Sequence, residues 1–227
     1  MTNTALVTGG TGGLGAATIA AFLDAGWRVV APARPGSVDR LPAGVVAVPA
    51  DLTDPAGAAA AVATAAGDPD APLKAVVNLV GGYAGSGLIA DTPVDEFEAM
   101  LTTNLRPTYL TTAAALPHLI AAGGGAVVCV SSRAAVAPFP GAAGYVTAKA
   151  AVLAFAATVA VEYKKQGVRC NTVLPSVIDT PANRAAMPDA DHGRWVDPAE
   201  IAGTVLFLAS DASAPVSGAQ VPVYGQA

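Results

Sequence analysis

Short apolar runs alternate along the chain with longer stretches in which apolar residues recur at helical spacing. The runs predict seven strands, one beginning at Thr4 and the others over 28–31, 45–48, 75–80, 126–130, 168–173 and 220–224. The stretches between them predict helices over 16–25, 53–66, 94–121, 142–166 and 198–209. Because the runs are continuously apolar rather than alternating, we expect parallel strands covered on both faces.

This alternation of strands and helices predicts an α/β fold. Right-handed crossovers give a single-domain, Rossmann-like, doubly wound parallel β-sheet of about seven strands, with helices on both faces, over residues 1–227. Pro222 cannot donate to a strand ladder, so the last strand is expected at the sheet edge. Asp197, Pro198 and Glu200 form a typical helix start. The segment 181–195 is short and irregular, and we expect it to be a substrate loop.

Composition narrows the class of protein. The length of 227 residues suits one domain, and 53% hydrophobic with 13% charged residues argues against disorder. A net charge of −5 gives no electrostatic basis for binding nucleic acid or an anionic membrane. With no signal-like start and no uninterrupted apolar run of membrane-spanning length, we expect a cytoplasmic protein. Cys129 and Cys170 lie in predicted strands without metal-ligand spacing, which indicates reduced core thiols and no metal site.

The first strand leads into a glycine-rich turn followed by a helix. Strand, turn and helix in this order place backbone N–H groups and a helix N-terminus against a pyrophosphate. Three registers fit: G-x-G-x-x-G through positions 10, 12 and 15, T-G-x-x-G-x-x-G through 8, 9, 12 and 15, and T-G-x-x-x-G-x-G through 8, 9, 13 and 15. The last resembles the compact branch of the short-chain dehydrogenase/reductase family, but the glycines alone leave all three open.

Four residues further along favour that branch. Tyr145 and Lys149 are one helical turn apart and share a helix face. Ser132 follows the fifth strand, and Asn104 lies in the predicted helix before that strand. Together the four resemble the catalytic tetrad of the compact short-chain dehydrogenases/reductases, and the resemblance spans almost the whole chain.

The resemblance implies an NAD(P)-dependent oxidoreductase that transfers a hydride between a nicotinamide cofactor and a carbonyl/alcohol substrate, with Tyr145 as general acid/base. The free pKa of tyrosine is about 10, and we expect the Lys149 ammonium and the oxidised nicotinamide to lower it. Ser132 is expected to donate a hydrogen bond to the substrate oxygen. By resemblance, Lys149 also holds the ribose hydroxyls of the cofactor, and Asn104 holds a water that connects Lys149 to solvent.

The end of the second strand bears on cofactor choice. NAD-selective folds usually place an acid there, whereas this chain has Ala33 followed by Arg34. A guanidinium pairs with a 2′-phosphate, so NADP(H) is favoured over NAD(H), although an ordinary solvated arginine is the alternative. Arg40 is a second, less well placed candidate. Asp51, followed by Leu52, matches the family residue that reaches the adenine amino group, and it is also a possible helix cap before Thr53.

The later strand ends resemble the family pattern in part. Asn78 and Gly81 match N-N-A-G, but the two residues between them do not. Ser176 replaces the glycine of P-G-x-I/V-x-T, which makes the nicotinamide carboxamide contacts the least secure. The predicted cofactor-binding residues are Gly9, Thr11, Gly12, Gly13, Leu14, Gly15, Arg34, Asp51, Leu52, Asn78, Gly81, Tyr145, Lys149, Pro175, Ile178 and Thr180.

Substrate choice is expected from 83–89, 133–139 and 181–195. Phe139, Met187 and Trp195 either form an apolar wall or belong to the core, and Arg133 or Arg184 is a candidate for binding an acidic substrate. Two alternative functions remain: an epimerase or dehydratase of the extended short-chain type, and a non-enzymatic dinucleotide sensor. The intact Tyr/Lys pair and the absence of a larger C-terminal part count against them.

The predicted helix 142–166 is apolar on several faces. Such a helix needs cover beyond its own sheet. Members of the family commonly pair this helix and the one before it across a two-fold axis, so we expect a homo-oligomer, a tetramer or a dimer. Burial entirely within one subunit is the alternative.

Overall fold

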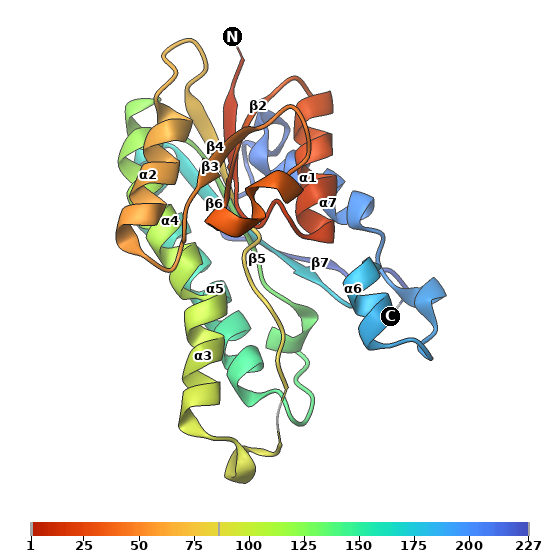
Figure 1. Cartoon of the computed structure of the whole chain (residues 1–227). Coiled ribbons are helices and arrows are strands. Elements are labelled where there is room, and N and C mark those ends of the chain that lie inside the picture. The colour runs from red at the N-terminus through yellow and green to blue at the C-terminus, as the bar shows by residue number, and fades with distance from the viewer. Residues whose placement is uncertain (1, 86, 227) are drawn as a thin grey trace.

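Seven parallel strands form the central sheet of the described part of the chain, with helices on both faces (Figure 1). The computed structural model describes residues 2–85 and 87–226. The strand order is β3-β2-β1-β4-β5-β6-β7, so the strand sequence reverses direction between β1 and β4. This is the predicted doubly wound topology, in which ligands bind beyond the carboxyl ends of the strands near the reversal.

The bounds of the elements follow the predicted pattern closely. The strands are β1 (Thr4–Val7), β2 (Arg28–Ala33), β3 (Val46–Pro49), β4 (Leu73–Asn78), β5 (Gly125–Val130), β6 (Val168–Pro175) and β7 (Gln220–Val223). The α-helices are α1 (Gly13–Asp24), α2 (Pro55–Ala66), α3 (Val94–Asn104), α4 (Arg106–Ala121), α5 (Ala143–Glu162), α6 (Pro181–Ala186) and α7 (Pro198–Ala209).

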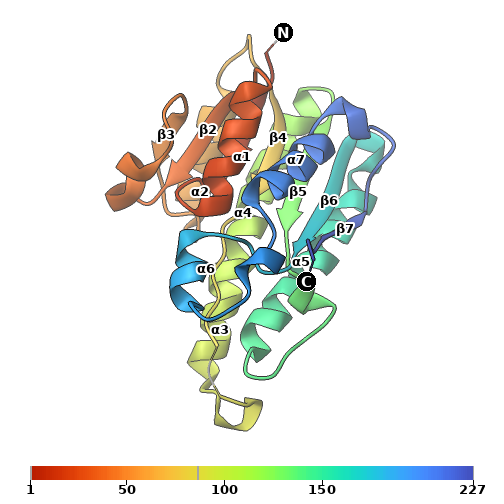
Figure 2. The same ribbon diagram turned by 90° about the vertical axis from the view of Figure 1, so that its right-hand side faces the viewer.

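Two apolar cores lie on the two faces of the sheet. Successive strand side chains point to opposite faces. Leu6 of β1 therefore belongs to the core that α2, α4 and α5 cover, whereas Ala5 and Val7 belong to the core under α1 and α7. Figure 2 shows α1 and α7 side by side in front of the sheet. Burial on both faces explains why the strands are continuously apolar.

Two predictions about the end of the chain are confirmed. β7, which contains Pro222, pairs only with β6 among the described strands and forms one edge of the sheet. Helix α7 begins at Pro198, and the Asp197 carboxylate caps it by accepting a hydrogen bond of 2.8 Å from the Ala199 N–H.

The predicted helix over 94–121 is wrong, because this region forms two helices. α3 ends at Asn104 and α4 begins at Arg106, with Leu105 between them at φ −102° and ψ −47°. Pro107 stands in the first turn of α4, where its missing N–H is tolerated, but it would break a continuous helix. The break leaves the Asn104 side chain at a helix end beside the sheet.

Other boundaries also differ. The first helix begins at Gly13, the second at Pro55, and the predicted 142–166 helix ends at Glu162 and continues as a 3₁₀ turn over Lys164–Gln166. The segment 181–195 is less irregular than predicted, because it contains α6 and a 3₁₀ turn over His192–Arg194.

Helix α5 has the length and apolarity of a membrane-spanning helix. It has 20 residues and a mean hydropathy of 1.6. Its inner face, however, packs into the core through Val152, Ala156 and Val159, and Lys149 projects from it near the sheet. Core packing therefore accounts for a large part of its apolar character.

Candidate active site

A single cleft of about 1120 Å³ collects loops from the carboxyl ends of the strands. Its volume exceeds the roughly 300–1,000 Å³ of a typical small-molecule site, which leaves room for an extended ligand. Of the predicted site residues, fifteen line the cleft: Gly9, Thr11, Gly12, Gly13, Leu14, Gly15, Arg34, Asp51, Leu52, Gly81, Ser132, Tyr145, Lys149, Pro175 and Ile178. Three do not, namely Asn78, Asn104 and Thr180.

The glycine turn distinguishes between the three registers. Gly9 has φ +72°, a conformation that favours glycine, and a Cβ on Gly15 would overlap the Gly9 carbonyl oxygen. A Cβ on Gly13 would lie 2.8 Å from the Thr180 methyl carbon, whereas one on Gly12 would meet nothing closer than 3.5 Å. A Cβ on Gly10 would also be close to its neighbours, at 2.7 Å from the Ile19 Cδ1, but Gly12 is free of such contacts. Because Gly12 belongs to the two other registers and Gly13 only to T-G-x-x-x-G-x-G, the contrast between positions 12 and 13 favours T-G-x-x-x-G-x-G. The threonine of the motif, Thr8, is buried and accepts a hydrogen bond of 3.0 Å from the Leu79 N–H.

The N-terminus of α1 opens into this cleft without a side-chain cap. Gly12 is the N-cap residue, and no acidic residue occupies the first turn. The first N–H groups of a helix have no partner within the helix, and the helix dipole favours negative charge there. The turn thus fits a pyrophosphate, which is the group that a nicotinamide dinucleotide presents.

Asp51 and Arg34 lie at the far end of the cleft. The Asp51 carboxylate accepts hydrogen bonds of 2.9 Å and 2.8 Å from the N–H and hydroxyl of Thr53. These bonds lower the pKa of Asp51, and the charge of Arg34 lowers it further. Asp51 does not cap the helix as suggested, because α2 begins only at Pro55, with Asp54 as its N-cap.

Asn78 does not face the cleft, contrary to its predicted cofactor role. It is buried, and its side-chain amide donates hydrogen bonds to the Thr112 hydroxyl at 2.9 Å and the Cys129 sulfur at 3.8 Å. It therefore joins β4 to α4 and β5 beneath the site. The sequence pattern correctly places Asn78 at the end of a strand. Because successive side chains of a strand point to opposite faces, its side chain points towards α4.

Asn104 holds the backbone after β4. Its amide oxygen accepts a 3.1 Å hydrogen bond from the Gly82 N–H, and its amide nitrogen donates to the carbonyl oxygens of Gly82 and Met100, both at 3.0 Å. A Cβ on Gly81 would lie 2.6 Å from Asn104 Oδ1 and 3.0 Å from Lys149 Nζ. Asn104 and Lys149 are thus both within contact distance of Gly81.

Lys149 is almost fully buried at 5% exposure. Its ammonium donates a 3.1 Å hydrogen bond to the Val130 carbonyl oxygen at the end of β5. Burial lowers the pKa of Lys149 to about 8, and the nearby Cys129 thiol partly opposes that effect. Ser131, also buried, donates a 2.7 Å hydrogen bond to the Lys149 carbonyl oxygen and ties β5 to α5.

The expected acidification of Tyr145 by Lys149 does not occur in the protein alone. Burial raises the pKa of Tyr145, the charge of Tyr83 raises it further, and a hydrogen bond with Ser132 opposes both. The Lys149 nitrogen lies 5.8 Å from the centroid of the Tyr145 ring. Removing a phenol from water disfavours its charged form. The phenol therefore remains protonated at neutral pH in the protein by itself.

The Ser132 side chain is positioned by the 3₁₀ turn that follows β5. Its hydroxyl oxygen accepts a 3.1 Å hydrogen bond from the Ala134 N–H and so caps the 3₁₀ turn over Arg133–Ala135. This contact fixes the side chain as an acceptor and leaves its O–H available as a donor towards Tyr145 or a substrate oxygen. The preference for Ser132 over Ser131 agrees with the geometry.

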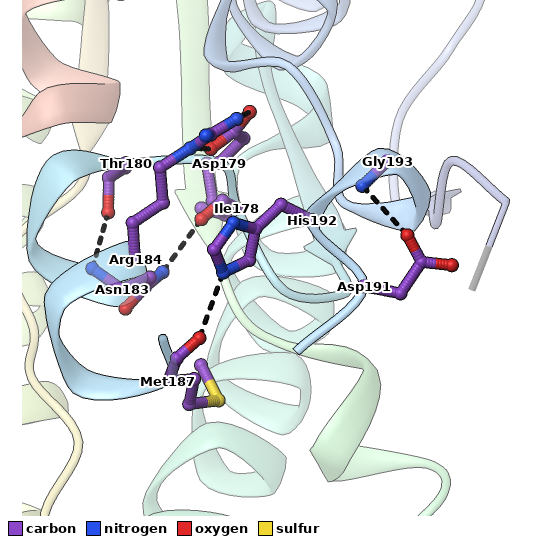
Figure 3. A network of polar contacts seen from close by, with 9 residues as sticks. All are labelled: Ile178, Asp179, Thr180, Asn183, Arg184, Met187, Asp191, His192 and Gly193. Atoms are coloured by element: carbon purple, nitrogen blue, oxygen red, sulfur yellow. Dashed lines mark hydrogen bonds and ion pairs between the residues drawn. The ribbon is translucent and has the colours of Figure 1, made fainter. Parts of the chain in front are cut away.

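The loop after β6 is fixed by polar contacts (Figure 3). The Thr180 hydroxyl accepts a 3.2 Å hydrogen bond from the Asn183 N–H and caps α6, and the Asn183 amide donates to the Ile178 carbonyl at 2.8 Å. The backbone at Ser176 needs no glycine, because no described non-glycine residue has a positive φ. Its hydroxyl instead donates a 2.7 Å hydrogen bond to the Tyr224 carbonyl.

Arg184 and Trp195, two candidates for substrate contacts, do not line the described cleft. The Arg184 guanidinium pairs with both carboxylate oxygens of Asp179, at 2.5 Å and 2.7 Å. Trp195 lies outside the cleft and stacks on His192, with ring centroids 4.4 Å apart. Met187 does line the cleft, and its carbonyl oxygen lies 2.8 Å from a ring nitrogen of His192 (Figure 3).

Comparison with known proteins agrees with this geometry. The sequence model of the family described as short chain dehydrogenase matches residues 3–191. The chain belongs to the short-chain dehydrogenase/reductase family. It is 32% identical to the 2-(R)-hydroxypropyl-CoM dehydrogenase of Xanthobacter autotrophicus, over 99% of this chain and 98% of that protein. It is 30% identical to an L-rhamnose 1-dehydrogenase (NAD(P)(+)) of Azotobacter vinelandii, over 98% and 95%.

The fold agrees as well. A short-chain type dehydrogenase/reductase from Mycobacterium ulcerans superposes with a TM-score of 0.90 and 27% identity, over 99% of this chain and 89% of that one. Such relatives establish an NAD(P)-dependent oxidoreductase with the fold of the family.

Sequence reasoning gave no individual role to several residues that line the cleft of this short-chain dehydrogenase/reductase, among them Asn183 and Tyr83. Asn183 was noted only as a member of an irregular segment, because the helix that positions it was not predicted. Tyr83 was noted only as the start of a substrate segment, yet its ring packs edge-on against Tyr145, with centroids 5.2 Å apart. Ser86, in the same segment, lies outside the described residues.

Proposed function

We propose that this protein is an NADP(H)-linked oxidoreductase that interconverts a carbonyl compound and the corresponding alcohol, with Tyr145 as the proton donor and acceptor. One observation carries the proposal. Ser132, Tyr145 and Lys149 line the same cleft as the uncapped N-terminus of α1, so a reacting group and a dinucleotide site share one space.

A nicotinamide cofactor, when bound, supplies or accepts the hydride. The N–H groups after Gly12 would hold its pyrophosphate, Asp51 its adenine, and Lys149 its ribose hydroxyls. Ile178, which lines the cleft after β6, would hold the carboxamide. The resemblance assigns Thr180 the same role, but its hydroxyl caps α6 and does not line the cleft in the protein alone.

The proton chemistry belongs to the chain itself. The Ser132 hydroxyl orients the substrate oxygen and stabilises negative charge that develops there. Tyr145 then donates its phenolic proton to that oxygen. Because burial raises the pKa of Tyr145, the phenol is already protonated at neutral pH, which suits the reductive direction.

The preference for NADP(H) rests on two guanidinium groups beside the glycine turn. Arg34 lines the cleft directly after β2, and Arg40 reaches the Thr11 carbonyl oxygen at 3.5 Å. Neither forms an ion pair among the described residues. A 2′-phosphate would meet two cations at this end, with the Asp51 carboxylate as the one acid that lines the cleft.

We also propose a cytoplasmic homo-oligomer that assembles through the outer faces of α4 and α5, without a membrane or nucleic-acid partner. Tyr109, 54% exposed, stacks edge-on against Phe155 across these helices at 5.8 Å, and Val161 is 78% exposed. The two buried free thiols suit a reducing compartment. Light scattering on purified protein tests the assembly, and a monomer at micromolar concentration would contradict it.

The experiment that tests the function follows NADPH absorbance with a panel of ketones, and NADP⁺ reduction with the matching alcohols. Net oxidation or reduction of the cofactor is the expected result. Substrate conversion without net cofactor change would indicate an epimerase or dehydratase. Cofactor binding without any conversion across the panel would indicate a dinucleotide sensor.

A further inference from the structure

Two aromatic side chains, Tyr83 and Phe139, lie at the Tyr145 end of the cleft, and Met187 lines the same cleft. Tyr83 is 59% exposed, Phe139 45% and Met187 39%, and all three line the cleft. The Tyr83 and Phe139 rings lie with centroids 6.1 Å apart, and Tyr83 meets Tyr145 at an interplanar angle of 90°. Exposed aromatic surface of this kind, directly beside a reacting hydroxyl, indicates a ligand that covers it.

The Tyr83 ring lies over the backbone of Gly85. A Cβ on Gly85 would overlap the Tyr83 hydroxyl and would lie 3.0 Å from the Gly141 carbonyl oxygen, so the tip of the ring occupies space that a side chain at position 85 would fill. The other end of the contact is Tyr145, against which the ring packs edge-on, and 59% of Tyr83 stays exposed to a ligand.

The charged side chains near the cleft are directed away from its Tyr145 end or lie elsewhere. The one acid that lines the described cleft, Asp51, lies at the opposite end with Arg34. Arg133 also lines the cleft, but its guanidinium stacks over the Tyr224 ring at 5.0 Å, and Tyr224 is not part of the cleft wall. Arg184 is paired with Asp179 and does not line the cleft. Beside the aromatic rings near Tyr145, the polar groups are therefore the Ser132 hydroxyl, the buried Lys149 and an Arg133 whose charge lies over Tyr224.

We infer that the substrate carries a flat, ring-sized apolar group next to its reacting carbon, and that Tyr83, Phe139 and Met187 bind this group. The inference rests on the proposed function, which places the reacting carbon at Tyr145. An aryl ketone, or its secondary alcohol, is the chemical class that fits. Tyr83 and Phe139 would then determine specificity without taking part in proton transfer.

A binding measurement with unreactive amides tests the inference independently of turnover. Benzamide and acetamide share a carbonyl group that does not accept hydride, and they differ in the phenyl ring. We expect calorimetric titration, with and without NADP⁺, to show benzamide binding about tenfold tighter than acetamide. In Tyr83→Ala and Phe139→Ala this ratio should fall to about threefold or less, whereas Tyr83→Phe should keep it.

Phe207→Ala is the matched control, because Phe207 is 46% exposed on α7 and does not line the cleft. It should leave the ratio unchanged, and thermal unfolding should show that all variants are folded. Equal binding of the two amides, or a ratio that the cleft variants do not alter, would overturn the inference. A benzamide preference without NADPH oxidation on acetophenone would support the apolar site and contradict the proposed hydride transfer.

Discussion

The amide oxygen of Asn104 lies where a side chain on Gly81 would begin: a Cβ placed there would be 2.6 Å away. The Lys149 nitrogen is 3.0 Å from the same point. The backbone after β4 therefore passes close to both the Asn104 amide and the Lys149 ammonium. The position of this backbone depends on the two hydrogen bonds between Asn104 and Gly82 and on the absence of a side chain at Gly81.

Gly81→Ala should consequently disturb both neighbours. We expect the free energy of unfolding to fall by about 1–3 kcal/mol, because the methyl group would displace the buried side chains of Asn104 and Lys149. Turnover should fall as well, since Lys149 must move. Urea unfolding and steady-state rates measure the two effects. Gly203→Ala, a helical position with nothing within 4 Å of the added carbon, should stabilise the protein by about 0.5–1 kcal/mol. If Gly81→Ala and Gly203→Ala changed the free energy of unfolding and the turnover equally, the close contact of Gly81 with Asn104 and Lys149 would be refuted.

The register of the glycine turn makes a second prediction. A methyl group at Gly13, which belongs only to T-G-x-x-x-G-x-G, would lie 2.8 Å from the Thr180 methyl carbon, whereas one at Gly12 has ordinary contacts at 3.5 Å. Gly13→Ala should therefore lower the thermal midpoint by several degrees, corresponding to about 1–3 kcal/mol. Gly12→Ala should change it much less. Differential scanning calorimetry compares them, and a larger loss in Gly12→Ala would favour one of the other registers.

Much of this fold follows from local pattern. Continuous apolar runs identified the strands, and Pro222 identified the edge, because burial on two faces and a missing N–H act at single positions. The break between α3 and α4 was missed, because apolar spacing continues smoothly past Leu105 and only Pro107 indicates the interruption. The short helix α6 was missed because six residues are too few to show the helical spacing of apolar side chains.

The site was predictable by residue type but not by orientation. The tetrad spacing brought Ser132, Tyr145 and Lys149 to one cleft as expected. Asn78 was misassigned, because the sequence locates a strand end but not the face on which its last side chain lies. In the protein alone, burial raises the pKa of Tyr145, an effect that the sequence does not reveal because it gives the nearby charge but not the depth of burial. The lowering of this pKa by Lys149 and the oxidised nicotinamide together stays a prediction.

The burial of Lys149 predicts a pH-dependent stability. Its pKa falls from 10.5 to about 8 in the folded protein. The unfolded chain therefore binds more protons between these values, and this contribution to the free energy of unfolding rises with pH across that window. Below about pH 8 the full cost of burying the ammonium is present.

In Lys149→Met this pH dependence disappears. The stability of the native protein relative to the variant should increase by about 2 kcal/mol between pH 7.5 and 9.5, as measured by urea unfolding. Lys165→Met, which removes an exposed lysine, serves as the control. A difference that stays constant over this range would show that the Lys149 ammonium is not buried at neutral pH.

Cofactor preference is tested at Arg34. We expect the native protein to bind NADPH more tightly than NADH, and Arg34→Ala to weaken NADPH binding about 10- to 100-fold because a charge-assisted hydrogen bond is lost. NADH affinity should stay nearly constant, and Arg34→Lys should retain part of the preference. Fluorescence titration gives all affinities. An unchanged preference for NADPH over NADH in Arg34→Ala would show that Arg34 does not bind the 2′-phosphate.

The central claim is that the Tyr145 hydroxyl moves the proton when hydride is transferred. The most direct measurement compares native protein, Tyr145→Phe and the control Tyr163→Phe for both turnover and NADPH affinity. We expect Tyr145→Phe to lose about 10²- to 10⁴-fold in turnover while its NADPH dissociation constant changes by less than about threefold. Tyr163→Phe, at the C-terminal end of the same helix, should resemble the native protein in both. Turnover of Tyr145→Phe within a factor of about ten of the native rate would contradict the claim.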